Sequence, residues 1–381
     1  MTADLAGVRA VGLRVQICGD AHVQNLGTFA AADGELVFDL NDFDETLPGP
    51  WEWDLKRFAA SAVLAGRESG APETRCADAV ASLVRSYRGS MRTFATLPFL
   101  ELMRYKVRRR TRTGLVGDAL AKAKRATPLQ LLGKLAKRRR GSWELHDRAP
   151  ILAHVSDRTA RRVVRALGDY RHTLRADRRI TLDAYRPVDV AFRVGGIGSV
   201  GVRNYIVLLF GRSPEDPLVL QVKQAFPPCG TGYLKLPSFP HQGQRIAEGQ
   251  SLMQTGTDPL VGWTRIAGRD FVVRQLADHK ARVETADLRG RSLDLFAEVA
   301  GEILSRAHAR TGDAAAIAGY CGDSERLDKA IARFAVLYAD QVEKDFSDFR
   351  AAVRKGKLGS AHAVRGVAGG LSQALSRISA S

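Results

Sequence analysis

Two polar residues near the start of the chain have the types and spacing that phosphoryl transfer requires. Asp20 and Asn25 lie five positions apart in the run CGDAHVQN, which follows a short apolar segment. Phosphoryl transfer uses a carboxylate that orients the attacking hydroxyl and accepts its proton, and an amide oxygen five residues later that binds Mg²⁺. The spacing therefore predicts Asp20 as the catalytic carboxylate and Asn25 as a metal ligand. His22 and Arg57 would either contact phosphate or only support this loop.

A second acidic run, NDFDE, follows at residues 41–45. Mg²⁺ is a hard cation that prefers oxygen ligands, so carboxylates in this run would suit it. We expect Asp42 to bind the metal and take Asp44 as the second candidate, whereas Asp39 has the pattern of a strand residue. The alternative is an acidic hairpin end whose carboxylates only cap the backbone.

A glycine-dense turn in the second half of the chain could cover phosphate groups. Its sequence GIGSVG at 196–201 fits the pattern G-x-G-x-x-G. A dinucleotide fingerprint needs a helix after this motif, whereas a phosphate-covering loop of the kinase type lies between two antiparallel strands. The apolar run 204–210 predicts a strand, which favours the phosphate-covering loop. Cofactor contacts are then expected at four positions of the turn: Gly196, Gly198, Ser199 and Gly201.

A loop of that type needs a rigidly held cation beneath it. Lys223 ends the run LQVK on the expected next strand, where its ammonium group could hold the nucleotide phosphates. Glu248, on the helix expected to follow, is the candidate carboxylate that orients Lys223. The alternatives are an ordinary strand lysine and an exposed helix carboxylate.

These segments resemble known families. The run GDAHVQN at 19–25 is similar to the catalytic loop of aminoglycoside phosphotransferases and related small-molecule kinases, and the spacing from Asp42 to Asp54-Leu55 resembles theirs. A closer resemblance, over nearly the whole chain, is to the uncharacterised bacterial family called domain of unknown function 2252. The more distant likeness implies a kinase-like fold that uses ATP and Mg²⁺. The segments that carry the closer resemblance are 18–25, 38–54, 198–201 and 306–310.

The order of the motifs is reversed relative to those kinases, which place the glycine loop before the catalytic loop. A circular permutation would account for the order, since the contacts between lobes do not depend on where the chain is cut. The helix around 302–310 would then precede the catalytic loop in space, and an N-terminal helical segment would be absent. Cys18 stands where the phosphotransferase loop usually has a histidine.

The pattern of apolar residues predicts the elements that position these groups. The Asp33-Gly34 pair predicts a hairpin turn, and Asp54 is expected to cap a helix that opens near Trp53. From there to about residue 179 the pattern is helical, rich in Ala, Leu and Arg, with few β-branched runs. Strands are predicted at 14–17, 26–30, 35–40, 189–194, 204–210, 218–223 and 270–275, and later helices at 244–253 and from 292 to the C-terminus.

We therefore expect an α/β (α+β) protein with a two-lobed, protein-kinase-like fold in circularly permuted order. A helical lobe of residues 1–186 would carry the catalytic and metal-binding loops. A small lobe of 187–284, built on an antiparallel sheet, would grip the nucleotide, and 285–381 would return to the helical lobe.

Composition limits the remaining classes. The chain has 381 residues, a formal charge of +17 and four widely spaced cysteines, so no disulfide framework or zinc site is predicted. No stretch is long and apolar enough to span a membrane and no secretory signal is evident, which favours a cytoplasmic location. Basic runs at 104–110 and 122–140 suit polyanionic partners, or are simply solvated helix faces.

The sequence thus predicts an ATP- and Mg²⁺-dependent phosphotransferase with an unknown, small-molecule acceptor; nucleotidyl transfer would fit the same residues. A nucleotide-binding regulator without turnover is the first alternative. A metal-dependent phosphoesterase, prompted by the Gly19–His22 segment, would need further histidine motifs, and nucleic-acid binding would lack a recognised reading motif.

Overall fold

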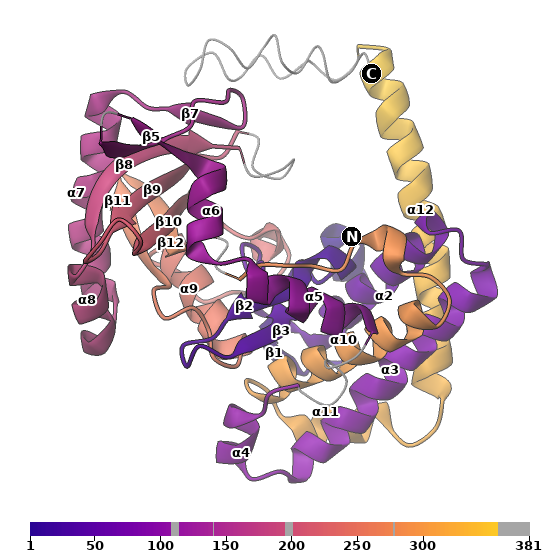
Figure 1. The fold of residues 1–381 in the computed structure, drawn as a ribbon. Helices are drawn as coiled ribbons and strands as arrows, with labels where there is room; N and C mark the ends of the chain where they lie inside the picture. Colours follow the sequence, from indigo (N-terminus) through magenta and orange to yellow (C-terminus); the bar gives the residue numbers. More distant parts are fainter. Residues whose placement is uncertain (108–113, 140, 195–200, 277–278, 357–381) are drawn as a thin grey trace. The chain divides into compact units, whose positions relative to one another are not determined.

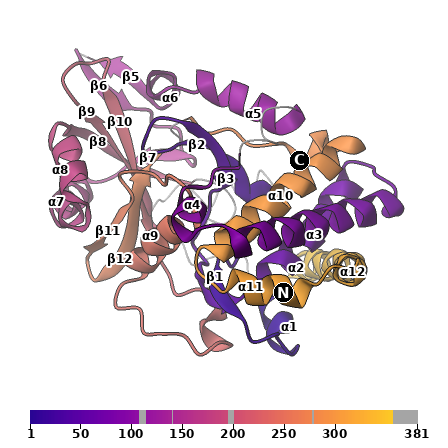
Figure 2. The same cartoon turned by 90° about the horizontal axis from the view of Figure 1, so that it is seen from below.

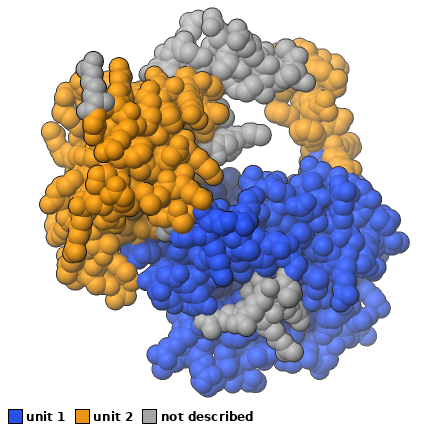
Figure 3. Space-filling view, in the orientation of Figure 1, with its two compact units in different colours: residues 1–126, 226–259, 279–342 blue, residues 127–225, 260–278, 343–381 orange. Residues whose placement is uncertain are grey.

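The protein was studied as a computed structural model, which describes residues 1–107, 114–139, 141–194, 201–276 and 279–356. The chain forms two compact units, coloured separately in Figure 3. Unit 1 contains residues 1–126, 226–259 and 279–342, and unit 2 contains 127–225, 260–278 and 343–381. Each unit is described by itself below.

Two small antiparallel ribbons form the β-structure of unit 1. Strand β1 (Arg14–Ile17) pairs with β4 (Leu47–Pro50), so that Ile17 lies opposite Leu47. Strands β2 (Leu26–Ala30) and β3 (Leu36–Leu40) form the hairpin that the Asp33-Gly34 pair predicts. Gly34 has a φ of +80°, which a glycine adopts without steric cost. The ribbons place the loop after β1 and the turn after β3 within the same unit.

Long helices pack around these ribbons. Helix α2 (Trp51–Glu68) is buried over most of its surface, including Leu55 and Phe58. Helix α10 (Arg291–Ala309) lies along α3 (Glu73–Thr96), as Figures 1 and 2 both show, and its side chains from Val299 to Ala309 are all buried. Helix α10 therefore forms the centre of the apolar core of unit 1.

Further helices and turns complete unit 1. The helices are α1 (Thr2–Ala6), α4 (Phe99–Arg104), α5 (Gly114–Arg125), α9 (Gln242–Met253), α11 (Ala314–Cys321) and α12 (Arg326–Arg354), which begins in this unit. The short 3-10 turns are Val23–Asn25, Cys229–Gly232 and Thr285–Asp287. Helix α9 contacts β1 and α10, so it belongs to the core around the loop that follows β1 and carries Asp20.

Unit 2 is built on a six-stranded antiparallel sheet with the order β11-β12-β10-β9-β8-β7. Its strands are β7 (Leu152–His154), β8 (Arg186–Arg193), β9 (Asn204–Phe210), β10 (Pro217–Gln224), β11 (Gly262–Ile266) and β12 (Arg269–Gln275). Alternate side chains of each strand point to opposite faces, and both faces of β9 are buried. The sheet therefore has a covered layer on each side.

Helices and a hairpin cover the two faces. Helix α7 (Asp157–Thr173) packs on the face that contains Tyr205, Val207 and Leu220, next to α8 (Ala176–Asp183). The opposite face carries Ile206 and Leu208. It is covered by α6 (Pro128–Leu135) and by the hairpin β5 (Ala136–Arg139) and β6 (Ser142–Leu145).

The structure corrects three local expectations. Helix α2 begins at Trp51 directly after Pro50, so Asp54 lies in its first turn and is not its cap. Residues 47–50, where no strand was predicted, form strand β4. Three short strands, β5 to β7, interrupt the region expected to be helical up to residue 179, because Ala136, Leu145 and Leu152 gain burial against the large sheet.

The other predicted elements are confirmed within one to three residues at most boundaries, as expected for helix and strand ends. The helices expected from 292 onward are confirmed up to 354, and residues 357–381 lie outside the described residues. Strand β11 was not predicted. Within the described part of the chain, no helix is both long and apolar enough to cross a membrane.

Candidate active site

The loop that follows β1 is fixed by a buried carboxylate. Asp54 is 1% exposed, and its two oxygens accept hydrogen bonds from the backbone N–H groups of Cys18 (2.6 Å) and Gly19 (2.9 Å). Gly19 has a φ of +77°, and an added Cβ atom would collide with the carbonyl oxygen of Glu45. Only glycine satisfies both conditions, so the close approach of this loop to Glu45 requires glycine at position 19.

Asp20 lies half-exposed at the surface of this loop beside a cation from α2. The guanidinium group of Arg57 donates to Asp20 Oδ1 through both Nε (2.6 Å) and Nη2. His22 Nε2 lies 3.8 Å from Asp20 Oδ2. Burial lowers the pKa of His22, although the charges of Asp20 and Asp42 oppose this, so the ring is mostly neutral at pH 7. Arg57 therefore supports the carboxylate expected to be catalytic.

Asn25 joins the Asp20 loop to the acidic turn after β3. Its Nδ2 donates to the carbonyl oxygens of Asp20 (3.0 Å) and Asp42 (3.0 Å), and its Oδ1 accepts from the N–H groups of Asn41 (3.1 Å) and Asp42 (2.6 Å). The side chain is 2% exposed. The structure thus gives Asn25 a positioning role, and its role as a metal ligand stays a prediction because its oxygen already faces two backbone donors.

Asp42 and Asp44 lie on the same tight turn, which is anchored by the fully buried Phe43. The N–H group of Asp44 points at Asp42 Oδ1 (3.4 Å), and the thiol of Cys18 donates to the carbonyl oxygen of Asp42 (3.1 Å). Burial raises the pKa of Cys18, and the nearby Asp54 carboxylate adds to the shift, so the thiol stays protonated and can donate. Asp42 and Asp44 are both partly exposed, although Oδ1 of Asp44 is buried.

The set of anionic groups is small for a metal held by protein alone. Among the residues that the structure describes, no group of three or more His, Cys, Asp or Glu side chains is arranged to hold an ion. Mg²⁺ commonly binds through one or two carboxylates while substrate phosphates and water complete its octahedron. The partly exposed Asp42 and Asp44 fit that mode of binding, in which the nucleotide brings most of the ligands.

A buried arginine that the sequence did not reveal holds the acidic turn from α9. Arg245 is 3% exposed and donates to the carbonyl oxygens of Asp44 (2.8 Å) and Thr46 (2.5 Å). Burial lowers the pKa of Arg245 to about 10, and the charges of Glu45 and Asp44 oppose the shift. The only signal in the sequence was an arginine on the apolar face of an otherwise amphipathic helix.

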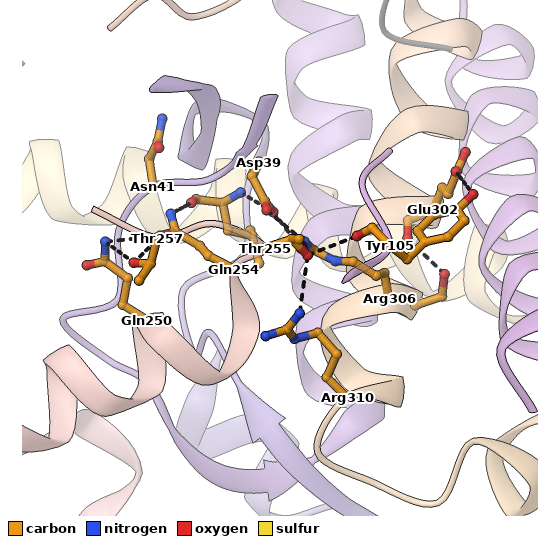
Figure 4. Close-up of polar contacts among 12 residues, drawn as sticks. Asp39, Asn41, Tyr105, Gln250, Gln254, Thr255, Thr257, Glu302, Arg306 and Arg310 are labelled. Carbon is orange, nitrogen blue, oxygen red and sulfur yellow. Dashed lines mark hydrogen bonds and ion pairs between the residues drawn. The ribbon is translucent and has the colours of Figure 1, made fainter. Parts of the chain in front are cut away.

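A second buried network ties β3 to α10 (Figure 4). Arg306 makes a bidentate ion pair with Asp39, with Nη1–Oδ2 and Nη2–Oδ1 distances of 2.8 and 2.7 Å. Both side chains are almost completely buried. Thr255 accepts from Arg306, and Gln254 donates to the carbonyl oxygen of Leu40. Asp39, expected to be only a strand residue, therefore anchors the strand that carries the acidic turn.

The predicted residues of the second half of the site lie in different units. Lys223 is half-buried on β10 of unit 2, where its backbone pairs with Asn204 and Val272. Glu248 is exposed on α9 of unit 1 and accepts from Gln244 Nε2 (2.7 Å). Pairing of Lys223 with Glu248 stays a prediction.

The face of the sheet that carries Lys223 is polar near the glycine turn. Asn204 Oδ1 accepts from Gln221 Nε2 (3.0 Å), and Gln221 Oε1 accepts from Arg274 Nε (3.0 Å). Burial lowers the pKa of Arg193, one strand further along the same face. Of the glycine turn itself, Gly196, Gly198 and Ser199 lie outside the described residues. Gly201 is exposed with a φ of +83°.

Part of the basic surface is engaged in ion pairs. Lys106, in the run 104–110, bonds Asp33 Oδ2 (2.6 Å) and Glu35 Oε2 (2.7 Å) across the β2–β3 turn. Residues 108–110 and Arg140, which end the two runs, lie outside the described residues.

The fold and this site define a protein of mixed helices and strands whose acidic loops are fixed by buried polar groups. The chain matches, over residues 1–352, the profile of the family described as an uncharacterized protein conserved in bacteria (DUF2252), and it belongs to that family. No curated protein and no solved structure was found to match the chain.

Proposed function

We propose that the protein is an ATP- and Mg²⁺-dependent phosphotransferase with a circularly permuted, kinase-like fold, acting on a small-molecule hydroxyl acceptor. One observation carries the proposal: the Asn25 side chain bonds the backbone of both Asp20 and Asp42. The loop with the expected proton acceptor and the turn with the expected metal ligand are thereby held as one piece. Phosphoryl transfer depends mainly on such positioning and on charge stabilisation.

In the proposed reaction, the acceptor oxygen bonds to the γ-phosphorus of ATP while its proton passes to the Asp20 carboxylate. The bond between the γ-phosphorus and the bridging oxygen breaks, and ADP leaves. Arg57 fixes the Asp20 carboxylate through two hydrogen bonds to Oδ1. Asp42, with Asp44 beside it, would hold the Mg²⁺ that neutralises the phosphate charge.

Unit 2 would supply the grip on the nucleotide. Lys223 lies on a strand of an antiparallel sheet, two strands after the start of the glycine turn, as the proposal requires. Gln221 and Asn204 beside it form a hydrogen-bonded row that fixes this end of the face. In this proposal Lys223 contacts the phosphates, the glycine turn covers them, and Glu248 orients Lys223.

Calorimetric titration with ATP and Mg²⁺ tests the binding step. We expect Lys223→Ala and Asp42→Asn each to weaken binding by about tenfold or more, because each removes a charged contact with the metal–triphosphate group. Lys344→Ala and Asp348→Asn, exposed on α12, are the matched controls and should bind as wild type does. Wild-type affinity in either Lys223→Ala or Asp42→Asn would detach that segment from the nucleotide.

Turnover is tested separately by measuring ADP release with a panel of hydroxyl-bearing acceptors. Asp20→Asn should retain binding of ATP and lose nearly all of the release, since the amide cannot accept the proton. Equal release by Asp20→Asn and wild type would contradict the assigned role.

A nucleotide-binding regulator without turnover is the second candidate. Two contacts favour it: the Asn25 oxygen faces backbone N–H groups, and Arg57 already occupies an oxygen of Asp20. Binding of ATP without ADP release on any acceptor, in wild type as in Asp20→Asn, would support this candidate.

A further inference from the structure

A cavity of about 410 Å³ lies in unit 2 on the side of the large sheet that α7 covers. Its walls come from the end of β7, the start of α7, strands β8 and β9, and the β11–β12 turn. Three arginines line it: Arg162, Arg203 and Arg269. Its volume falls in the range of small-molecule sites.

The strand register places this cavity on the face opposite Lys223. Tyr205, which lines the cavity, pairs with Phe192 on one side and with Val222 on the other. Because side chains alternate along a strand, Lys223 must point to the other face. Arg203 lies two residues from Tyr205, so it shares the cavity face. The cavity is therefore separate from the nucleotide grip proposed above.

The three arginines are not neutralised by neighbours. Within the described part of the chain, no hydrogen bond or ion pair is recorded for the side chains of Arg162, Arg203 and Arg269, and no Asp or Glu lines the cavity. Arg265, on the adjacent strand, shows the contrast, because its Nε bonds Asp270 Oδ1 at 2.9 Å. An uncompensated cluster of guanidinium groups attracts an anion, and phosphate suits their planar donors best.

Further groups add to the positive potential and to the selectivity. The cavity includes Ser156, which caps the N-terminus of α7, where the helix dipole and free N–H groups favour negative charge. Tyr205 lines the cavity together with Arg203 and Arg269. Burial raises the pKa of Tyr205, while the charges of these two arginines oppose the shift. The hydroxyl of Tyr205 has no hydrogen-bond partner among the described residues and can donate to a ligand.

The rest of the wall is apolar and aromatic. Phe192 is half-buried and packs edge-to-face against Tyr205, with ring centroids 6.2 Å apart, and Ile266 and Val155 also line the cavity. An inorganic anion would leave this apolar surface uncovered. A ligand that joins a phosphate to a planar ring would cover both parts, since rings stack on aromatic side chains and on guanidinium planes.

We propose that this cavity is a second ligand site, which binds a nucleoside monophosphate or a closely similar phosphorylated ring compound. The phosphate lies among Arg162, Arg203 and Arg269 at the start of α7, and the ring lies on Phe192. Such a site, on the far face of the sheet that carries Lys223, would respond to a nucleotide without occupying the site for ATP.

Isothermal titration with AMP in the presence of EDTA tests the site, because removing divalent ions weakens binding that depends on a metal. The double variant Arg203→Ala/Arg269→Ala should bind AMP at least about tenfold more weakly than wild type, as expected for the loss of two charged contacts. Lys223→Ala should bind AMP as wild type does. Loss of binding in Lys223→Ala, with none in the double variant, would overturn the proposal.

A matched pair on α7 separates the cavity from general charge effects. Arg161 and Arg162 are both exposed neighbours, and only Arg162 lines the cavity. Arg162→Glu should weaken AMP binding by about tenfold or more, whereas Arg161→Glu should change it little. If both variants weakened AMP binding equally, the cause would be general positive charge on this surface, and the proposed site would be refuted.

Three probes define the ligand class. AMP should bind more tightly than both ribose 5-phosphate and adenosine, because only AMP has the phosphate and the ring. Equal affinity for ribose 5-phosphate and AMP would refute the role of Phe192, and absence of AMP binding to wild type would refute the site as a whole.

Discussion

The carboxylate of Asp54 accepts hydrogen bonds from the consecutive N–H groups of Cys18 and Gly19, and so holds the backbone just before Asp20. His308 Nε2 lies 3.4 Å from the same carboxylate, and its other ring nitrogen lies 2.9 Å from the hydroxyl of Tyr87. The loop is thus connected through Asp54 to the centre of the core formed by α3 and α10.

Replacing Asp54 with Asn should destabilise the loop before Asp20 without creating a cavity. An amide has one acceptor oxygen, so one of the two N–H groups would face an NH₂ group and lose its partner. We expect the free energy of unfolding to fall by about 2–4 kcal/mol, the usual cost of leaving a buried donor unpaired beside a lost charged hydrogen bond. Urea denaturation measures this. A change below about 0.5 kcal/mol would show that the two hydrogen bonds are not needed.

Gly19→Ala should destabilise the protein more than Gly34→Ala. Both glycines have positive φ angles, +77° and +80°, so both variants bear a similar backbone cost of about 1–2 kcal/mol. A Cβ at Gly34 meets open space, whereas one at Gly19 collides with the backbone of Glu45. The difference between the melting temperatures of the two variants therefore measures the effect of the collision at Gly19. Equal melting temperatures would contradict the close approach of the Gly19 loop to Glu45.

Breaking the buried ion pair between Asp39 and Arg306 should be costly in either single variant. Asp39→Asn or Arg306→Met leaves one charge buried without its partner. Such a change typically lowers the free energy of unfolding by about 3–5 kcal/mol. The double variant should cost less than the sum, since no charge then stays unpaired. A double-mutant cycle by urea denaturation gives the coupling. Arg171→Ala, which removes an exposed ion pair with Asp183, is the control and should have little effect.

Cys229 should be the thiol that reacts rapidly with a disulfide reagent, because Cys18, Cys76 and Cys321 are buried. Burial raises the pKa of Cys229, and its contact with Glu45 raises it further. A raised pKa means less thiolate at pH 8, and only the thiolate reacts. Glu45→Gln removes the negative charge and should lower the pKa of Cys229, so that more thiolate is present and the reaction at pH 8 becomes faster.

The control for the thiol experiment is Glu68→Gln, an exposed change at the end of α2 that should leave the rate as in wild type. Rapid reaction of two or more thiols in the folded protein would contradict the burial of the other cysteines. A slower reaction in Glu45→Gln would contradict the electrostatic effect of Glu45.

The sequence by itself determined the elements with a strong local period. Alternating apolar residues and an Asp-Gly turn specify the hairpin of β2 and β3, and the apolar runs specify β9, β10 and β12, since these patterns need no distant partner to be read. Family membership, too, was recognisable from the segments around Asp20 and Asp42.

Only the tertiary structure decided what the polar side chains do. Asp54 was expected to cap its own helix, yet it bonds a loop 35 residues earlier in the chain. Strands β5 and β6 replace expected helix because the large sheet offers them burial. Arg245 and Arg306 hold the acidic turn and its strand from helices 199 and 267 residues away. Such contacts depend on which surfaces meet after folding. A local residue pattern does not specify which distant segment of the chain will pack against it.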